Sequence, residues 1–143
     1  KHKIQFEIIP GITSGIGSAT YAGIPLTHRK FASSVVFVTG HEDSEKKKED
    51  VRWKKLAKST DTIVIMMGLA RISKICKQLS EGGMEKNTPV AVIQDGTTSK
   101  QKMITGTISN IAQKVKQSKI KPPSIIIIGK VVSLSKTIGW RKK

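Results

Sequence analysis

Residues 10–29 carry the densest set of side chains that could do chemistry, in the order PGITSGIGSATYAGIPLTHR. Thr13 or Ser14 is placed to cap a helix, because its side-chain oxygen can accept a hydrogen bond from a first-turn N–H group. The unpaired N–H groups of a helix start also suit a carboxylate or a phosphate. Gly15 and Gly17 indicate a close approach to the helix backbone, which packing of the helix on a sheet explains more simply than a ligand does.

The end of this stretch supplies a cationic group and a titratable group. Arg29 can form a two-pronged pair with a carboxylate, which matters if the ligand is a polyacid. His28 and His41, 13 positions apart, lack a third metal ligand, so no metal site is predicted. Each is a surface residue or, less often, a proton carrier. Because the signatures of phosphate-binding loops, dinucleotide-binding folds, zinc proteases and serine hydrolases are absent, the residues name no catalytic group.

Three predicted strands end in a glycine beside polar residues, which favours a binding cleft. In open α/β sheets, ligands bind in the crevice beyond the carboxyl ends of the strands. A glycine there lets a ligand approach the main chain, although each glycine alone is explained as well by a turn. The three strand ends are Thr39-Gly40-His41, Met67-Gly68 and Asp95-Gly96-Thr97. Together with the 10–14 turn they predict a small-molecule cleft.

Alternating apolar runs and amphipathic stretches predict the elements that position these groups. The predicted strands are 6–9, 34–39, 62–67, 90–93, 101–105 and 125–128. The predicted helices follow Thr13 or Ser14, cover 51–59 and 70–80, and run from a cap at Thr107 to Val115. Residues 41–50, HEDSEKKKED, are predicted to be a charged surface linker. The expected fold is α/β, with a mixed, partly antiparallel sheet flanked by helices.

Composition restricts the class of protein. The 143 residues fit a single domain, and 26 basic against 10 acidic residues give a net charge of +16. This charge favours an anionic partner, namely a nucleic acid, an acidic membrane surface or a polyanionic small molecule, unless the lysines are only solvated. Cys76 is the single cysteine, so it predicts a small core residue rather than a disulfide or a zinc site. Apolar runs such as 125–128 are too short for a membrane span, and a cytoplasmic setting is expected.

Five segments, taken in order, resemble one enzyme family. They are PGITSGIGSATYAGIPLTHRKFASS, VTGHE, the MMG strand end, PVAVIQDGTTSKQKMITGTI and IIIIGKVV. The sequence is similar to the uroporphyrinogen-III C-methyltransferases of the tetrapyrrole methylase superfamily, from about Phe6 to Trp140. YAGIPLTHR with VTGH resembles this family more than it resembles the precorrin methyltransferases or diphthine synthase.

The resemblance implies a cofactor, a substrate and a partner. The cofactor is S-adenosylmethionine, which leaves as S-adenosylhomocysteine. The substrate is uroporphyrinogen III, methylated to precorrin-2 on the route to sirohaem and cobalamin, and its carboxylates would account for the basic charge. A homodimer is expected, with no nucleic-acid or membrane partner. The implied cofactor contacts are Thr13, Ser14, Met67 and Gly96. The implied substrate contacts are Arg29 and, as weaker candidates, His28 and Tyr21.

The resemblance covers only part of the family pattern. Its early Gly-Pro-Gly-Asp turn and Gly-Gly-Asp-Pro loop have no counterpart in the 143 residues. Residues 1–30 are therefore expected to be the end of a first-domain strand, the glycine-rich helix and a linker, and residues 31–143 the C-terminal α/β domain. The catalytic residues are expected in the family's N-terminal half, so this chain alone should bind S-adenosylmethionine weakly and transfer no methyl group.

Two alternatives from other classes remain. A basic nucleic-acid-binding module explains the charge, but base stacking uses exposed aromatic side chains, of which the sequence has few. A non-catalytic dimerisation domain with a solvated basic tail is the other alternative. Affinity for RNA that falls steeply with salt favours the first. A stable dimer without a ligand response favours the second.

Overall fold

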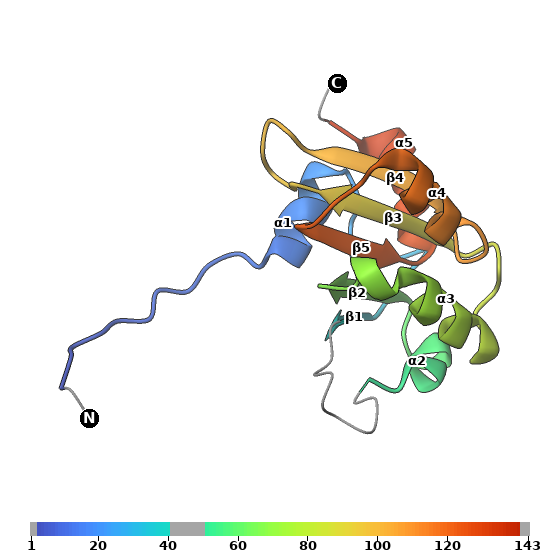
Figure 1. Ribbon diagram of the computed structural model, residues 1–143, viewed down its shortest axis with the longest axis horizontal. Coiled ribbons are helices and arrows are strands. Elements are labelled where there is room, and N and C mark those ends of the chain that lie inside the picture. Colours follow the sequence, from blue (N-terminus) through green and yellow to red (C-terminus); the bar gives the residue numbers. More distant parts are fainter. Residues whose placement is uncertain (1–2, 41–50, 141–143) are drawn as a thin grey trace.

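A five-stranded mixed sheet with helices on both faces forms the body of the protein (Figure 1). The computed structural model describes residues 3–40 and 51–140. The strands are β1 (Val35–Thr39), β2 (Thr62–Met66), β3 (Pro89–Gln94), β4 (Lys102–Thr107) and β5 (Ser124–Ile128). The helices are α1 (Ser14–Tyr21), α2 (Trp53–Ser59), α3 (Ile72–Glu81), α4 (Ile111–Ser118) and α5 (Ser135–Ile138), with 3₁₀ turns η1 (Leu69–Arg71) and η2 (Lys130–Leu134).

The strand order is β1-β2-β5-β3-β4. β1 and β2 are parallel, whereas β5 runs antiparallel to both β2 and β3, and β3 is antiparallel to β4. The last strand in the chain therefore lies in the middle of the sheet, where both of its edges are paired. The predicted α/β class with a mixed, partly antiparallel sheet is confirmed.

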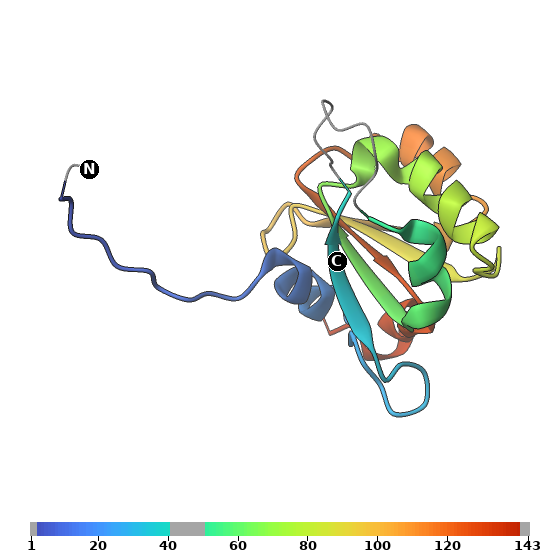
Figure 2. The same cartoon turned by 90° about the horizontal axis from the view of Figure 1, so that it is seen from below.

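The central strands are apolar on both sides because helices cover both faces (Figure 2). In β5, Ile126 and Ile128 face the core under α2, α3 and α4, while Ile125 and Ile127 face the core under α1 and η2. This alternation follows from the period of two in a strand. It explains why a run of four isoleucines forms a short buried strand.

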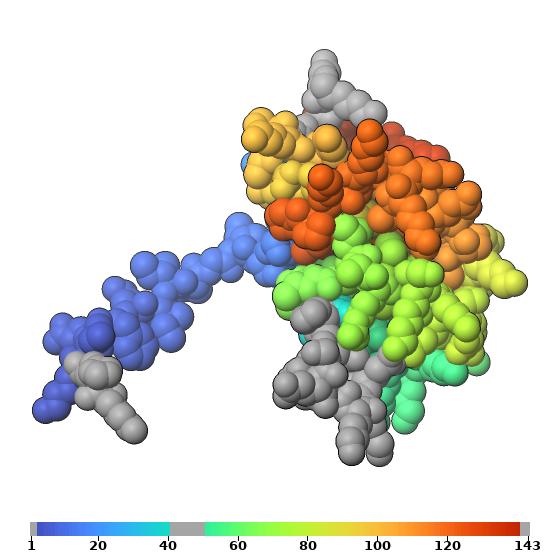
Figure 3. All heavy atoms as spheres, in the orientation of Figure 1, coloured from blue at the N-terminus to red at the C-terminus, as the bar shows by residue number. Residues whose placement is uncertain are grey.

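Residues 6–9 do not form the predicted strand. Ile4, Phe6 and Ile8 are 77%, 84% and 82% exposed, and the segment stands clear of the body of the protein (Figure 3). A strand needs a neighbour for its N–H and C=O groups, and no segment in the described part of the chain runs beside residues 6–9. The chain joins the body at α1, where Ala19 and Ala22 pack into the core under that helix. The predicted division at residue 30 stays a prediction.

Two further details differ from the sequence prediction. Thr107 ends β4 instead of capping a helix, and its N–H group donates to the side chain of Asn110, 2.9 Å away, just before α4 begins. Ile108, predicted on the inward face of that helix, is nevertheless buried, in the turn before it. Residues 130–138 form η2 and α5, which were not predicted.

The predicted linker at 41–50 lies outside the described residues. None of the described helices has the length and apolar character that a membrane crossing needs.

Candidate functional site

The start of α1 places two serines beside the end of the sheet at which β2 and β3 finish. Thr13 caps the helix, and its hydroxyl accepts from the N–H group of Gly15 at 3.4 Å. Ser14 and Ser18 follow one turn apart, which puts them on the same side of the helix. A Cβ at Gly15 would lie 2.8 Å from the Phe37 ring, so the glycine permits the close packing of α1 on β1. The simpler explanation of this glycine, helix packing, is the one that the structure supports.

Three strands have an end here, on the same side of the sheet. β2 ends at Met66 and continues into Met67, and β3 ends in the turn that begins with Asp95. Because β5 is antiparallel to both, its beginning at Ser124 lies at the same edge. The main chain links two of these segments, since the N–H group of Asp95 donates to the carbonyl of Pro123 at 3.1 Å.

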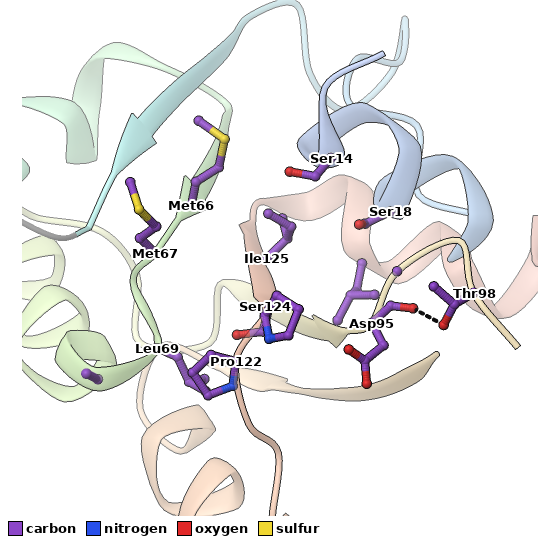
Figure 4. Close-up of a pocket in the computed structure, with 14 residues that line it drawn as sticks. Ser14, Ser18, Met66, Met67, Leu69, Asp95, Thr98, Pro122, Ser124 and Ile125 are labelled. Carbon is purple, nitrogen blue, oxygen red and sulfur yellow. Dashed lines mark hydrogen bonds between the residues drawn. The ribbon is translucent and has the colours of Figure 1, made fainter. Parts of the chain in front are cut away.

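A pocket of about 720 Å³ lies between these strand ends and α1 (Figure 4). Most of its lining is apolar, and the polar side chains come from Ser14, Ser18, Asp95, Thr98 and Ser124. The buried hydroxyl of Ser124 has no hydrogen-bond partner among the described residues. The remaining lining residues are Met66, Met67, Leu69, Ala70, Ile93, Gly96, Pro122, Pro123 and Ile125. An apolar cavity with a few polar groups is the usual form of a small-molecule site.

The backbone around the pocket adopts uncommon conformations. Met67, Asp95 and Thr97 have φ angles of 54°, 47° and 71°, in the left-handed region that favours glycine. Such residues persist only where the surrounding structure fixes them, and they cluster at binding sites. The strand ends of β2 and β3 are therefore held in shapes that the sequence would not adopt by itself.

Three of the four predicted cofactor contacts share this pocket, namely Ser14, Met67 and Gly96. Thr13 is adjacent as the cap of α1 but does not line it. The predicted reason for the glycines needs correction. The space beside Gly96 is filled by the side chain of Ser18, the space beside Gly40 by the backbone of Gly68, and the space beside Gly68 by the side chain of Ile65. Protein atoms, and not an open path for a ligand, occupy the space that these glycines leave.

The three predicted substrate contacts do not line the pocket. His28 and Arg29 lie in a turn closed by bonds between His28 and Ala32, just before β1. Because β1 is parallel to β2, this turn is at the end of the sheet opposite Met67. Tyr21 packs edge-on against Trp140, with ring centroids 5.2 Å apart, at the other end of α1 from Ser14. Their role in substrate binding stays a prediction.

Sequence reasoning missed several lining residues. Asp95 stands in the DGTT turn beside the predicted Gly96, so its polarity was an available signal. Pro122 and Ser124 carried no signal, because the antiparallel insertion of β5 between β2 and β3 brings them to the pocket. The small side chain of Ser18 was visible in the sequence only as part of a helix without bulk.

Titratable groups outside the pocket have structural roles. The pKa of Asp61 is lowered, first by the Ser33 N–H group and then by the Ser34 hydroxyl, which donate to its carboxylate at 2.9 and 3.0 Å. Burial raises the pKa of the Cys76 thiol to about 11, which makes it unreactive, and its place in the core confirms the prediction. The described residues contain no group of three or more His, Cys, Asp or Glu side chains that could hold a metal ion.

Comparison with known proteins assigns the family. Residues 1–112 match the tetrapyrrole (corrin/porphyrin) methylases. The chain belongs to the tetrapyrrole methylase family. A siroheme synthase of Nitrosomonas eutropha is 46% identical over 140 residues, which is 98% of this chain and 29% of that protein. A uroporphyrinogen-III C-methyltransferase of Priestia megaterium is 47% identical over 132 residues, covering 92% of this chain and 55% of that protein.

The tetrapyrrole methylase fold is confirmed by a solved structure. The uroporphyrin-III C-methyl transferase of Thermus thermophilus, complexed with S-adenosyl homocysteine, superposes with a TM-score of 0.75 at 27% identity. The match covers 93% of this chain and 56% of that protein. This tetrapyrrole methylase chain thus spans little more than half the length of the P. megaterium and T. thermophilus proteins, and less than a third of the siroheme synthase.

Proposed function

We propose that this chain contributes the C-terminal part of the active site of an S-adenosylmethionine-dependent uroporphyrinogen-III C-methyltransferase, which makes precorrin-2. The observation that carries the proposal is the single pocket shared by Ser14, Met67 and Gly96. The proposed reaction is taken from the names of the relatives. These relatives are longer and contain segments that have no match in this chain. The cytoplasmic setting and the homodimer are part of the same proposal.

The pocket residues fit the proposed cofactor. Its apolar lining, which includes Met66, Leu69 and Ile125, suits a purine ring and a thioether chain. The hydroxyl of Ser14 offers a polar contact at the start of α1. The volume of about 720 Å³ is within the usual range for small-molecule sites.

The residues of this chain would position the cofactor and exclude water. The bound cofactor supplies an activated methyl group on its sulfonium, so the protein needs no covalent nucleophile. Met67 and Leu69 would cover one side of the pocket, and the turn that begins at Asp95 the other. Met67 is 66% exposed in this chain, which leaves that side open to water. We therefore propose that the chain alone binds the cofactor weakly and transfers no methyl group.

The basic charge supports a polyanionic substrate. The net charge of +16 would attract the carboxylates of a uroporphyrinogen. Arg29 is the proposed contact, with His28 and Tyr21 as weaker candidates. Because Arg29 lies at the opposite end of the sheet from the pocket, its contact with a substrate depends on where the substrate extends or on a second subunit.

Calorimetric titration with S-adenosylhomocysteine tests the proposal. The titrated proteins are this chain and a chimera in which the N-terminal part of the P. megaterium relative precedes it. We expect saturable binding to the chimera, weaker binding to the chain, and methylation of uroporphyrinogen III by the chimera alone. Ala70→Trp should block the pocket, whereas Gln113→Trp on exposed α4 should not. Absence of binding by both proteins would refute the proposed function, and methylation by the chain alone would refute its inactivity.

A further inference from the structure

Asp95 is the one charged side chain among the described residues that line the pocket. Its neighbours in the lining are mostly aliphatic, thioether or proline side chains. A carboxylate beside such a surface is costly to desolvate unless a donor pairs with it. None of the lysine and arginine side chains that the structure describes lines this pocket. The unbalanced negative charge is thus a specific property of the site.

Gln94 holds this carboxylate. Its side-chain Nε2 donates to Oδ2 of Asp95 at 2.8 Å, and its Oε1 accepts from the N–H group of Lys121 at 2.9 Å. The amide therefore joins the end of β3 to the loop before β5, across one wall of the pocket. Gln94 donates to Oδ2 of Asp95. The other carboxylate oxygen, Oδ1, is therefore the one that the described part of the chain leaves for a ligand.

The turn that carries Asp95 is fixed at several points. The hydroxyl of Thr98 donates to the carbonyl of Asp95 at 2.8 Å (Figure 4), and Gln101 accepts from the N–H group of Thr97 at 2.8 Å. Asp95 itself has a φ of 47° and donates through its N–H group to Pro123. A group held in this way before a ligand arrives loses little freedom when it binds one.

We propose that Asp95, positioned by Gln94, accepts a hydrogen bond from an amino or ammonium group of the pocket ligand and so determines its specificity. The inference rests on the proposed function, because it takes the ligand to be an adenosyl compound with an amino acid tail. Such a ligand has two groups of the required chemistry, the amino group of the purine and the ammonium group of the tail. Asp95 selects for whichever of these two groups lies next to its carboxylate.

Three ligands separate the two groups in calorimetric titrations of this chain and of the chimera. S-Adenosylhomocysteine has both groups, S-inosylhomocysteine lacks the purine amino group, and methylthioadenosine lacks the ammonium group. Asp95→Asn is compared with Glu81→Gln, which removes the same charge from an exposed site outside the pocket. Urea unfolding of each variant shows whether it is folded. Gln94→Met tests the positioning residue while keeping the length of the side chain.

We expect Asp95→Asn to lower the affinity for S-adenosylhomocysteine about tenfold, as removal of a hydrogen bond to a charged group does. Glu81→Gln should leave this affinity unchanged. The ligand that lacks the contacted group should bind both proteins alike. Gln94→Met should reduce the same preference by a smaller factor. Equal binding of all three ligands by wild type and Asp95→Asn would overturn the inference, as would equal weakening of all three, which indicates a structural role. Either result leaves the proposed function standing, provided that the wild-type protein binds S-adenosylhomocysteine.

Discussion

The two ends of the sheet are built in opposite ways. At the pocket end, Met67 and Asp95 have backbone conformations that favour glycine, and the side chains border an open apolar cavity. At the other end, the carboxylate of Asp61 accepts from the N–H and hydroxyl groups of Ser33 and Ser34 at 2.9–3.1 Å. The N–H group of Asp61 donates back to the Ser34 hydroxyl at 2.9 Å.

This difference separates a stabilising end from a binding end. The bonds around Asp61 tie the start of β1 to the start of β2, so they fix the register of the parallel pair. At the pocket end the bonds fix the turn after β3 and the loop before β5, and they do not tie one strand start to another. Buried hydroxyls without a partner among the described residues occur at both ends, at Ser124 beside the pocket and at Thr62 at the start of β2. Strained backbone and unsatisfied groups lower stability, and binding sites commonly retain them.

The contact between α1 and the turn after β3 gives the largest predicted effect. In Gly96→Ala, the new Cβ would overlap Ser18, which is 3% exposed and has no room to move. We expect the free energy of unfolding to fall by about 2 kcal/mol, as overpacking does. Binding of S-adenosylhomocysteine should be lost, because the pocket lies along this contact. Urea unfolding and calorimetry measure the two effects.

A second substitution provides the control for this prediction. Ser18→Gly removes the side-chain atoms that the new methyl group would meet. The double variant Gly96→Ala, Ser18→Gly should therefore be more stable than the sum of the two single effects predicts. Additive effects would show that the glycine is needed for its backbone and not for the contact with α1.

The sequence predicted the fold well where patterns are local. The isoleucine run 125–128 and the amphipathic spacing of Ile72, Ile75 and Leu79 predicted β5 and α3, which the structure confirms. The prediction of a strand at 6–9 was wrong because an apolar run does not show whether a partner strand is beside it. The helical segment at 130–138 was missed because its buried residues, Val131 and Val132, continue a β-branched run.

The second prediction concerns the stabilising end. Asp61→Asn keeps the shape of the side chain but removes its charge, so the bonds from Ser33 and Ser34 weaken. We expect a loss of about 1 kcal/mol at pH 7, which is modest because the carboxylate is exposed. Binding at the pocket should not change, since Asp61 does not line it.

The pH dependence of this loss follows from the direction of the pKa shift. The pKa of Asp61 in the folded protein is below its ordinary value, because the Ser33 N–H and Ser34 hydroxyl groups stabilise the charged form. The contribution is therefore complete above the unfolded pKa of about 3.9 and is lost as pH falls through the lower folded pKa. Wild type and Asp61→Asn should differ fully at pH 7 and converge in acid, as measured by urea unfolding at each pH. A difference that persists undiminished in acid would contradict this.

The site was only partly predictable, and the reason is topological. Ser14, Met67 and Gly96 were implied by the family resemblance, and each lies at a turn or strand end that the sequence pattern also marked. Ser124 lies 57 residues beyond Met67 in the sequence, and it reaches the pocket only because β5 is inserted between β2 and β3. No local pattern carries that information. The conformation of Met67 was equally hidden, since a methionine gives no sign of a left-handed backbone.

The smallest predicted effect separates stability from binding at Met67. Met67→Gly should raise the free energy of unfolding by about 0.5 kcal/mol. Glycine accepts a φ of 54° without strain, and its greater freedom in the unfolded chain offsets part of this gain. The same change removes an apolar side chain from the pocket and should weaken S-adenosylhomocysteine severalfold. Lys119→Gly is the matched control, since Lys119 has a φ of 57° at the end of α4 and does not line the pocket. It should give the same stabilisation with unchanged binding. If Met67→Gly lowered both stability and affinity while Lys119→Gly raised stability, Met67 would belong to the packing of the sheet, and the contrast between the two ends would fail at this residue.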